Sequence, residues 1–310
     1  MKRLFALALV FIGLQQMCAQ QDFQFTQFMF DRLSINPGVA GSVDNSICAT
    51  LLGRQQWSGF DNAPRTGLLN AHGQIPRWKS GIGVSLFFDE LGQEQNTVAR
   101  LHYAYHLQNV LNGKLGIGVS AGYLSKSLGN NWVAIDPVMG DPLIPQEATS
   151  AGIMDFSFGL YYYTSKFYLG LSSTHLSEGD IEDVNISAAR HYWLQTGYTH
   201  SLNSDFDLNP NVIVKTDAAA TSVDVNLTAI YQNTFWFGVS YRTEDAIAPM
   251  LGYQTPLQDG KSMLKVGYSY DVNTSLLADF SSGGHELMVN YCLKLEKPLP
   301  PRIFKDPRFL

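Results

Sequence analysis

The chain has 310 residues and a formal net charge of −6, and only 15% of its residues are charged, compared with about 25% in ordinary globular proteins. The 27 glycines, 15 tyrosines and 18 phenylalanines favour β-strands and membrane interfaces over a charged, water-facing surface. The acidic balance argues against nucleic acid as a partner, because phosphate backbones attract basic surfaces.

The N-terminus has the layout of a secretory signal peptide. Lys2 and Arg3 form a positive n-region, and an apolar run at 4–14 precedes a permissive cleavage site near Gln20. The run is too short for a membrane-spanning helix, which needs about 20 apolar residues, and no second long apolar run follows. A helical membrane protein is therefore excluded. Cys18 would suit a lipoprotein signal, but the residues before it are not small, so we favour cleavage without lipidation.

Most of the chain after residue 43 alternates apolar with polar or small residues, which is the two-residue period of a β-strand. Between 97 and 107, Leu101 and Tyr103 share a face with other apolar residues, whereas Arg100 and His102 lie on the opposite face. The alternation recurs at 81–89, 114–124, 154–162, 223–231, 235–242, 264–271 and 286–294. Segments of about ten residues with aromatic ends match tilted transmembrane strands. We therefore predict an all-β transmembrane antiparallel β-barrel of roughly 14 strands, with its apolar face toward lipid.

The predicted domains follow from this pattern. Residues 1–20 form the signal peptide and residues 44–296 the barrel. The segment at 21–43 lacks the alternation, and we predict a plug inside the barrel or a periplasmic cap. Four prolines bar 297–310 from the strand ladder, so this stretch is expected to be a periplasmic tail or to fold back into the mouth of the barrel. The longest interruption, at 129–152, contains three prolines and is expected to be an extracellular loop.

Two cysteines remain once the signal peptide is removed. Cys48 lies in the first predicted strand and Cys292 in the last, and these strands are neighbours in a closed barrel. A disulfide and two separate small buried residues both fit this placement. We favour the second interpretation.

Motifs that resemble catalytic or metal sites are better explained by the barrel. Gly118, Ser120 and Gly122 match the G-x-S-x-G pattern of a hydrolase, but that pattern requires a strand-to-helix turn, and no helix follows here. Glycines at these positions instead keep the barrel interior small. His102 and His106 share a strand face but lie about 13 Å apart, too far for one zinc ion. We therefore expect no enzymatic activity, no metal and no cofactor.

Several blocks of the sequence resemble the PorP/SprF family of the type IX secretion system. The blocks are 24–30 (QFTQFMF), 33–37 (LSINP), 40–42 (AGS), 54–57 (RQQW), 63–66 (APRT), 282–287 (SGGHEL) and 306–310 (DPRFL). The pair Gly38-Val39 departs from the more aromatic or alanine-rich pair expected after Pro37. Together the blocks extend over essentially the whole mature chain.

The resemblance implies an outer-membrane protein of a Gram-negative cell that assists secretion or surface attachment of cargo with a C-terminal sorting domain, gliding-motility adhesins included. It also implies partners among the periplasmic ring proteins or peptidoglycan-binding proteins, beside outer-membrane lipid. The alternative is an outer-membrane channel for hydrophobic small molecules, since such barrels also place an Asn-Pro segment in the lumen.

Ten polar, aromatic or turn residues from these blocks and from the predicted lumen face are candidate lumen, plug or partner-docking residues. We expect the N-terminal segment and the turn at 285–286 to organise the lumen or the periplasmic mouth, braced by two arginines and a tryptophan from 54–65. The candidates are Asn36, Pro37, Arg54, Gln56, Trp57, Arg65, Arg100, His102, His285 and Glu286; the bracing residues are Arg54, Trp57 and Arg65.

Overall fold

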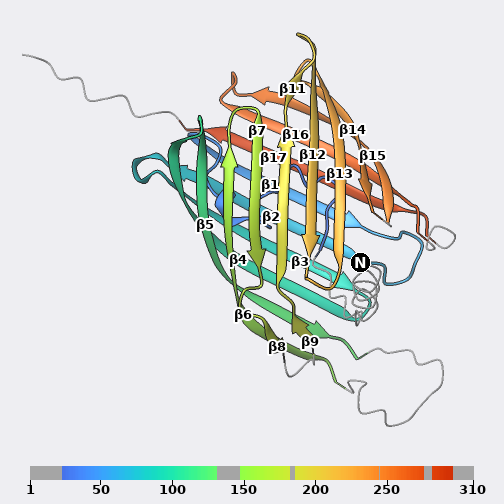
Figure 1. Ribbon diagram of the computed structural model, residues 1–310. Coiled ribbons are helices and arrows are strands. Elements are labelled where there is room, and N and C mark those ends of the chain that lie inside the picture. The colour runs from blue at the N-terminus through green and yellow to red at the C-terminus, as the bar shows by residue number, and fades with distance from the viewer. Residues whose placement is uncertain (1–22, 131–146, 182–185, 244, 276–280, 296–310) are drawn as a thin grey trace, which may run out of the picture.

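A barrel of antiparallel strands makes up nearly all of the regular structure (Figure 1). The computed structural model describes residues 23–130, 147–181, 186–243, 245–275 and 281–295. Its strands are β1 (Ser46–Gln55), β2 (Arg65–Ile75), β3 (Ser80–Leu91), β4 (Glu94–Val110), β5 (Gly113–Leu128), β6 (Thr149–Tyr163), β7 (Phe167–Thr174), β8 (Gly179–Ile181), β9 (Ile186–Ala188), β10 (His191–Tyr198), β11 (His200–Ser201), β12 (Phe206–Thr216), β13 (Thr221–Tyr231), β14 (Phe235–Arg242), β15 (Ala246–Leu257), β16 (Ser262–Asn273) and β17 (Gly284–Lys294). Two short 3₁₀ helices are η1 (Pro37–Val39) and η2 (Pro76–Trp78). Within the described ranges, no helix is long and apolar enough to cross a membrane.

The main sheet closes on itself. It has 15 strands in nearly sequential order, and β11 is an addition to the edge of β12, so 15 less one leaves 14 strands in the ring. Pairing of β1 with β17 and of β10 with β12 completes the circle. Strands β8 and β9 form a separate two-stranded ladder. The predicted antiparallel barrel of roughly 14 strands is therefore confirmed.

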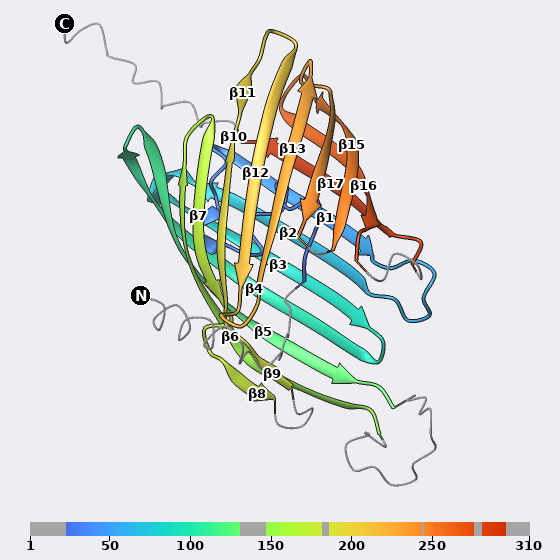
Figure 2. The same cartoon turned by 45° about the vertical axis from the view of Figure 1, so that its right-hand side comes forward.

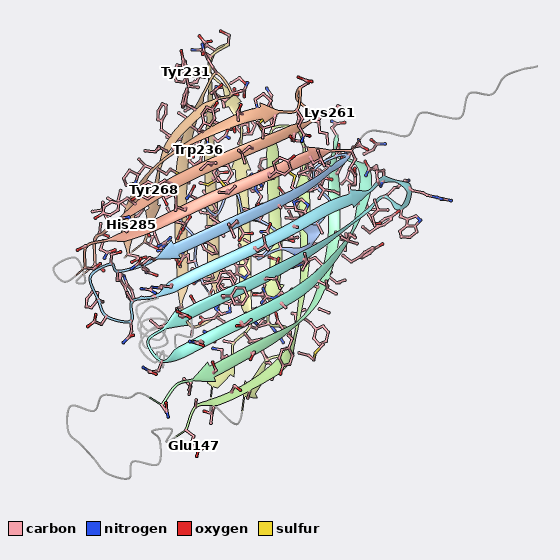
Figure 3. All side chains as sticks on the ribbon, turned by 180° about the vertical axis from the view of Figure 1, so that it is seen from behind. Glu147, Tyr231, Trp236, Lys261, Tyr268 and His285 are labelled. Carbon is pink, nitrogen blue, oxygen red and sulfur yellow. A yellow bond between two sulfur atoms is a disulfide. The ribbon has the colours of Figure 1, made fainter. Side chains whose placement is uncertain are left out.

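The connections distinguish two ends of the barrel. At the turn end, short connections such as 111–112 and 164–166 join neighbouring strands, and β1 begins and β17 ends there. At the opposite end, which we call the loop end, the longest described connection between ring strands, 56–64, lies beside short ones such as 92–93. Figure 3 shows Tyr231 and Lys261 at the turn end and Glu147 at the loop end. The predicted signal peptide, most of the predicted loop at 129–152 and the predicted tail lie outside the described residues, although β6 already begins at Thr149.

Alternation along each strand separates a lipid-facing surface from the lumen. On β4, Leu101 is 70% exposed whereas its neighbours Arg100 and His102 are buried. Leu227 on β13 and Leu251 on β15 likewise point outward. An apolar outer belt over a polar interior is the arrangement that a bilayer requires, because lipid offers no partner for polar groups.

Cys48 and Cys292 face each other across the β1–β17 pair and form a disulfide, with 2.06 Å between the sulfur atoms. Their predicted placement on neighbouring first and last strands is confirmed, but the interpretation as two unbridged residues is wrong. Only cysteines directly opposite in the register come close enough to bridge, and the sequence pattern alone did not fix that register. The disulfide ties the first strand to the last where the ring closes.

Candidate functional site: a segment held inside the barrel

The described part of the chain before β1 lies inside the ring, as the blue segment of Figure 2 shows. We call residues 23–43 the lumen segment. Near the loop end Phe23 stacks on Phe87 of β3, with 3.4 Å between ring centroids. At the turn end Asp44, directly after the segment, pairs with Lys114 at 2.5 Å. The segment therefore runs the length of the lumen. Its buried apolar side chains pack against Phe87, Trp193, Trp236 and Met288 of the wall and include Phe25, Phe28, Met29 and Ile35.

Glu286 holds the start of the lumen segment. This residue lies near the beginning of β17 and is 1% exposed. Its carboxylate accepts the backbone N–H of Thr26 at 2.7 Å and that of Gln27 at 2.8 Å. A buried carboxylate is costly unless donors meet its charge. The two backbone amides therefore couple the position of the segment to Glu286.

An ionic network surrounds this contact. Asp271 of β16 accepts a hydrogen bond from Arg54 of β1 at 2.6 Å and one from the hydroxyl of Thr26 at 2.7 Å. Arg54 also donates to the backbone carbonyl of Gln24. Arg242 of β14 donates to the same Thr26 hydroxyl at 3.2 Å. Charged side chains from three wall strands therefore bind the segment. Hydrogen bonds that involve a charged group are stronger than those between neutral groups.

Asp31 anchors the middle of the segment. Its buried carboxylate accepts a hydrogen bond from the Asn70 side chain of β2 at 2.6 Å and others from the backbone N–H and the hydroxyl of Ser34. Burial raises the pKa of Asp31 to about 6, and the hydrogen bonds from Ser34 and Asn70 oppose that shift. The charge of this anchor therefore changes between pH 4 and 7.

Wall side chains also bind backbone carbonyls of the segment. Arg100 of β4 donates to the carbonyl of Ser34 at 3.2 Å and pairs with Asp155 of β6 at 2.5 Å. The hydroxyl of Ser172 on β7 donates to the carbonyl of Ile35 at 2.7 Å. These donors satisfy carbonyls that would otherwise be buried without partners.

Asn36 and Pro37 begin the turn of the segment that forms η1. Asn36 is fully buried, and its side-chain oxygen accepts the N–H of Gly38 at 2.9 Å and so caps η1. Its side-chain amide donates to the carbonyl of Leu160 on β6 at 3.0 Å. Pro37 opens η1, where its missing N–H costs nothing.

Strands β5 and β6 approach this turn at positions that carry only glycine. A Cβ atom added at Gly116 or Gly118 would lie closer than 3.0 Å to the backbone of Gly38, and one at Gly159 would collide with the side chain of Asn36. Real Cβ atoms do not approach that closely. The glycines are therefore the surface on which the segment rests, which confirms that small residues line the lumen.

The candidate residues fall into four groups. Asn36, Pro37, Arg54, Arg100 and Glu286 belong to the segment or bind it, and His102 is buried in the wall, where it bonds Ser85 at 2.9 Å. The next two, Gln56 and Trp57, lie in the β1–β2 connection, which exchanges backbone hydrogen bonds with residues 282–283 through Ser58.

Arg65 and His285 are exposed and point away from the lumen. His285 instead bonds the hydroxyl of Tyr268 at 2.7 Å on the outer face (Figure 3). Of the three residues expected to brace the segment, Arg54 alone bonds it in the described part of the chain.

Several residues that hold the segment were not predicted from the sequence. Asp271 lies on the polar parity of its strand, so its lumen position was readable, but its partners were not. Thr26, Gln27 and Asp31 act partly through backbone groups or short local bonds, which no spacing rule reveals.

A closed antiparallel barrel with an apolar outer belt and an occupied lumen defines an outer-membrane β-barrel protein. The family model described as type IX secretion system membrane protein PorP/SprF matches residues 17–291. The chain therefore belongs to this family, as its sequence blocks predicted. No curated protein matches the sequence.

Solved structures similar to this chain are also outer-membrane barrels. The CymD monoaromatic hydrocarbon channel superposes with a TM-score of 0.54 at 13% identity and covers 88% of this chain and 94% of its own. A Pseudomonas aeruginosa FadL homologue gives 0.48 at 12% identity, covering 84% and 93%. Acinetobacter baumannii Omp33 gives 0.43 at 9% identity, covering 81% and 99%. At these identities the first similarity supports the fold alone, and the two weaker ones carry no argument.

Proposed function

We propose that this barrel is a docking component of the type IX secretion system that assists secretion or surface attachment of cargo proteins bearing a C-terminal sorting domain, gliding adhesins among them. In this proposal a signal peptide at residues 1–20 exports it to the outer membrane of a Gram-negative cell. Its partners are cargo and either periplasmic ring proteins or peptidoglycan-binding proteins. Family membership supports the type IX assignment.

The observation that favours docking over passage is the lumen segment itself. It runs along the lumen from the loop end to the turn end and is held by buried contacts from strands on opposite sides of the ring, such as those of Glu286 on β17 and Ser172 on β7. A lumen blocked in this way leaves the barrel to act through its two mouths and its outer surface.

The test compares two arginines that lie close together in the sequence. Arg54→Ala removes a buried partner of the segment, whereas Arg65→Ala changes an exposed side chain outside the lumen. In cells carrying each variant, surface display of a sorting-domain cargo should fall severalfold with Arg54→Ala and stay normal with Arg65→Ala at equal barrel abundance. Normal display in the Arg54 variant would contradict the proposed role of the segment.

Affinity purification of the tagged barrel provides an independent test. We expect recovery of a sorting-domain cargo or of secretion-ring proteins. Recovery of neither would count against docking.

The alternative is a channel for hydrophobic small molecules. CymD is described as a monoaromatic hydrocarbon channel and shares the barrel architecture. Uptake of toluene or a long-chain fatty acid that is lost on deletion of the gene, with cargo display unchanged, would favour the channel.

A further inference from the structure

Two adjoining cavities occupy the turn end of the lumen. Their volumes are about 660 and 410 Å³. Both are bordered by Arg32, Ser42, Val43, Asn209 and Asn211, so they lie side by side, and we call the two together the vestibule. A space of this size accommodates a small ligand or a few residues of a peptide.

Positive charge dominates the vestibule. Among the described residues, the vestibule has a single acidic lining residue, Asp44, which is already paired with Lys114 at 2.5 Å. Asp205, Asp207 and Asp259 lie at this end of the barrel but do not line either cavity. The lining cations are Arg32, Lys114, Lys166, Lys265 and Lys294.

Arg32 is held in place without a counter-ion. It donates to the carbonyl of Met29 and to the hydroxyl of Tyr161, both at 3.0 Å, and its guanidinium lies 3.8 Å over the ring of Tyr168. Lys265 lies 5.7 Å from the ring centroid of Phe30. Among the residues that the structure describes, no carboxylate lies within ion-pair distance of either cation.

At the loop end of the same lumen, the arginines have acidic partners. There Arg54, Arg100 and Arg242 each pair with an aspartate at 2.5 to 3.1 Å. Charge inside a barrel is costly unless an opposite charge meets it. The lumen thus compensates its cations at one end and leaves Arg32 and Lys265 uncompensated at the other.

We propose that the vestibule binds the carboxylate groups of an acidic peptide segment of a partner protein, with Arg32 and Lys265 as the two charge partners. The inference rests on the proposed docking function and assigns a site and a ligand chemistry to it. Entry is from the turn end, where the first strand begins and the last strand ends.

The remaining lining favours a peptide over other anions. Side-chain amides such as Asn109 and Asn209 pair with peptide N–H and C=O groups, and an alkyl chain would leave them without partners. Ile230, Trp236 and Met263 form an apolar wall that an inorganic phosphate would leave uncovered. An acidic peptide with apolar side chains matches both surfaces.

The chain's own residues 296–310 are a poor match, because they would bring more positive charge to a positive site. They contain four basic and two acidic side chains: Lys297, Arg302, Lys305 and Arg308 against Glu296 and Asp306.

The test uses the full-length barrel purified in a nonionic detergent and two capped hexapeptides. One peptide carries two aspartates and a leucine, and the matched peptide has asparagine at both acidic positions. Calorimetry on the wild type, Arg32→Gln, Lys265→Gln and Arg77→Gln gives the affinities. Arg77 is an exposed cation on η2 outside the vestibule and serves as the matched control. Heat-modified migration in a gel confirms that each variant is folded.

We expect the aspartate peptide to bind at least tenfold more tightly than the asparagine peptide. Arg32→Gln and Lys265→Gln should each weaken it about tenfold, the effect of one lost charge-assisted hydrogen bond, and Arg77→Gln should not. Equal binding of the two peptides would overturn the proposal. Binding of oleate in place of the peptide would also overturn it by assigning the site to a free carboxylic acid. Cargo display in the Arg54→Ala strain tests the docking function separately, so the two failures are distinguishable.

Discussion

The carboxylate of Glu286 accepts the backbone N–H of Thr26 at 2.7 Å, and the two residues lie 260 positions apart in the chain. The last strand of the ring therefore holds the segment that precedes the first strand. The same carboxylate accepts the N–H of Gln27, so moving the segment would leave a buried charge with neither donor. The resting position of the lumen segment depends on this pair.

Replacing Glu286 by Gln should loosen the segment. A neutral amide accepts one of the two backbone hydrogen bonds weakly, and losing a hydrogen bond to a charged group costs about 1.5–3 kcal/mol. Maleimide labelling of a cysteine introduced as Met29→Cys, a site 7% exposed, should accelerate at least tenfold in the Glu286→Gln background. His285→Gln, on the outer face of the same strand, is the control. Equal labelling rates in both backgrounds would refute the coupling.

Replacing Gly118 by Ala should push the segment away from β5. The new Cβ would overlap the backbone at Gly38 and Pro37, and neither η1 nor the strand can yield without breaking hydrogen bonds. Gly53→Ala is the matched control, because a Cβ there meets nothing within 4 Å. Limited proteolysis should cut the lumen segment in the Gly118 variant and leave it intact in the Gly53 variant. Protection of the segment in both would contradict the close approach.

Docking of the lumen segment should depend on pH through Asp31. Because burial raises its pKa to about 6 from 3.8, the docked state binds the proton more tightly. Its contribution is fully present below pH 4 and is lost as the pH rises to about 6, at roughly 1.4 kcal/mol per pH unit. The labelling rate of Met29→Cys, divided by the rate of a free thiol at the same pH, should therefore rise from pH 4 to 6 and level off above 7. Asp31→Asn should reduce this dependence, and an unchanged normalised pH profile in that variant would count against Asp31 as its source.

The disulfide between Cys48 and Cys292 should stabilise the closed ring. It joins residues 244 positions apart, and a chain-entropy model assigns about 5 kcal/mol to a loop of that length. The double variant Cys48→Ala/Cys292→Ala should convert from the folded to the unfolded gel band at a lower temperature than the oxidised wild type. Reduced wild type should behave like the variant. Identical transition temperatures for the oxidised wild type, the reduced wild type and the double variant would show that closure between β1 and β17 does not depend on the disulfide.

The strands were predictable because the two-residue period directs alternate side chains to the lipid face and to the lumen. Leu101, which faces outward, and Arg100, which is buried, illustrate this alternation. Register was not predictable from that period. A shift of one residue reverses a side chain's face, and Arg65 opposes Gln55, whose side chain points outward, while Arg54 points inward. Arg54 and Arg65 were expected to act together because both belong to the sequence blocks that resemble the family, and the blocks do not reveal which face each side chain occupies. The disulfide depended on the same unknown register.

The lumen segment was recognisable as something other than a strand, but its contacts were not. Its path is fixed by glycines on β5 and β6 and by acids such as Asp271 and Glu286 on distant strands. Those groups meet only after the ring has closed, so no local pattern reports them.

Ion conductance in a planar lipid bilayer tests the central claim most directly, namely that the lumen segment blocks passage through the barrel. The wild type and a variant lacking residues 23–43 are compared, after gel migration has shown that both are folded. The account predicts no stepwise conductance for the wild type and large, stable steps for the deletion variant. Steps of equal size in both proteins would contradict it.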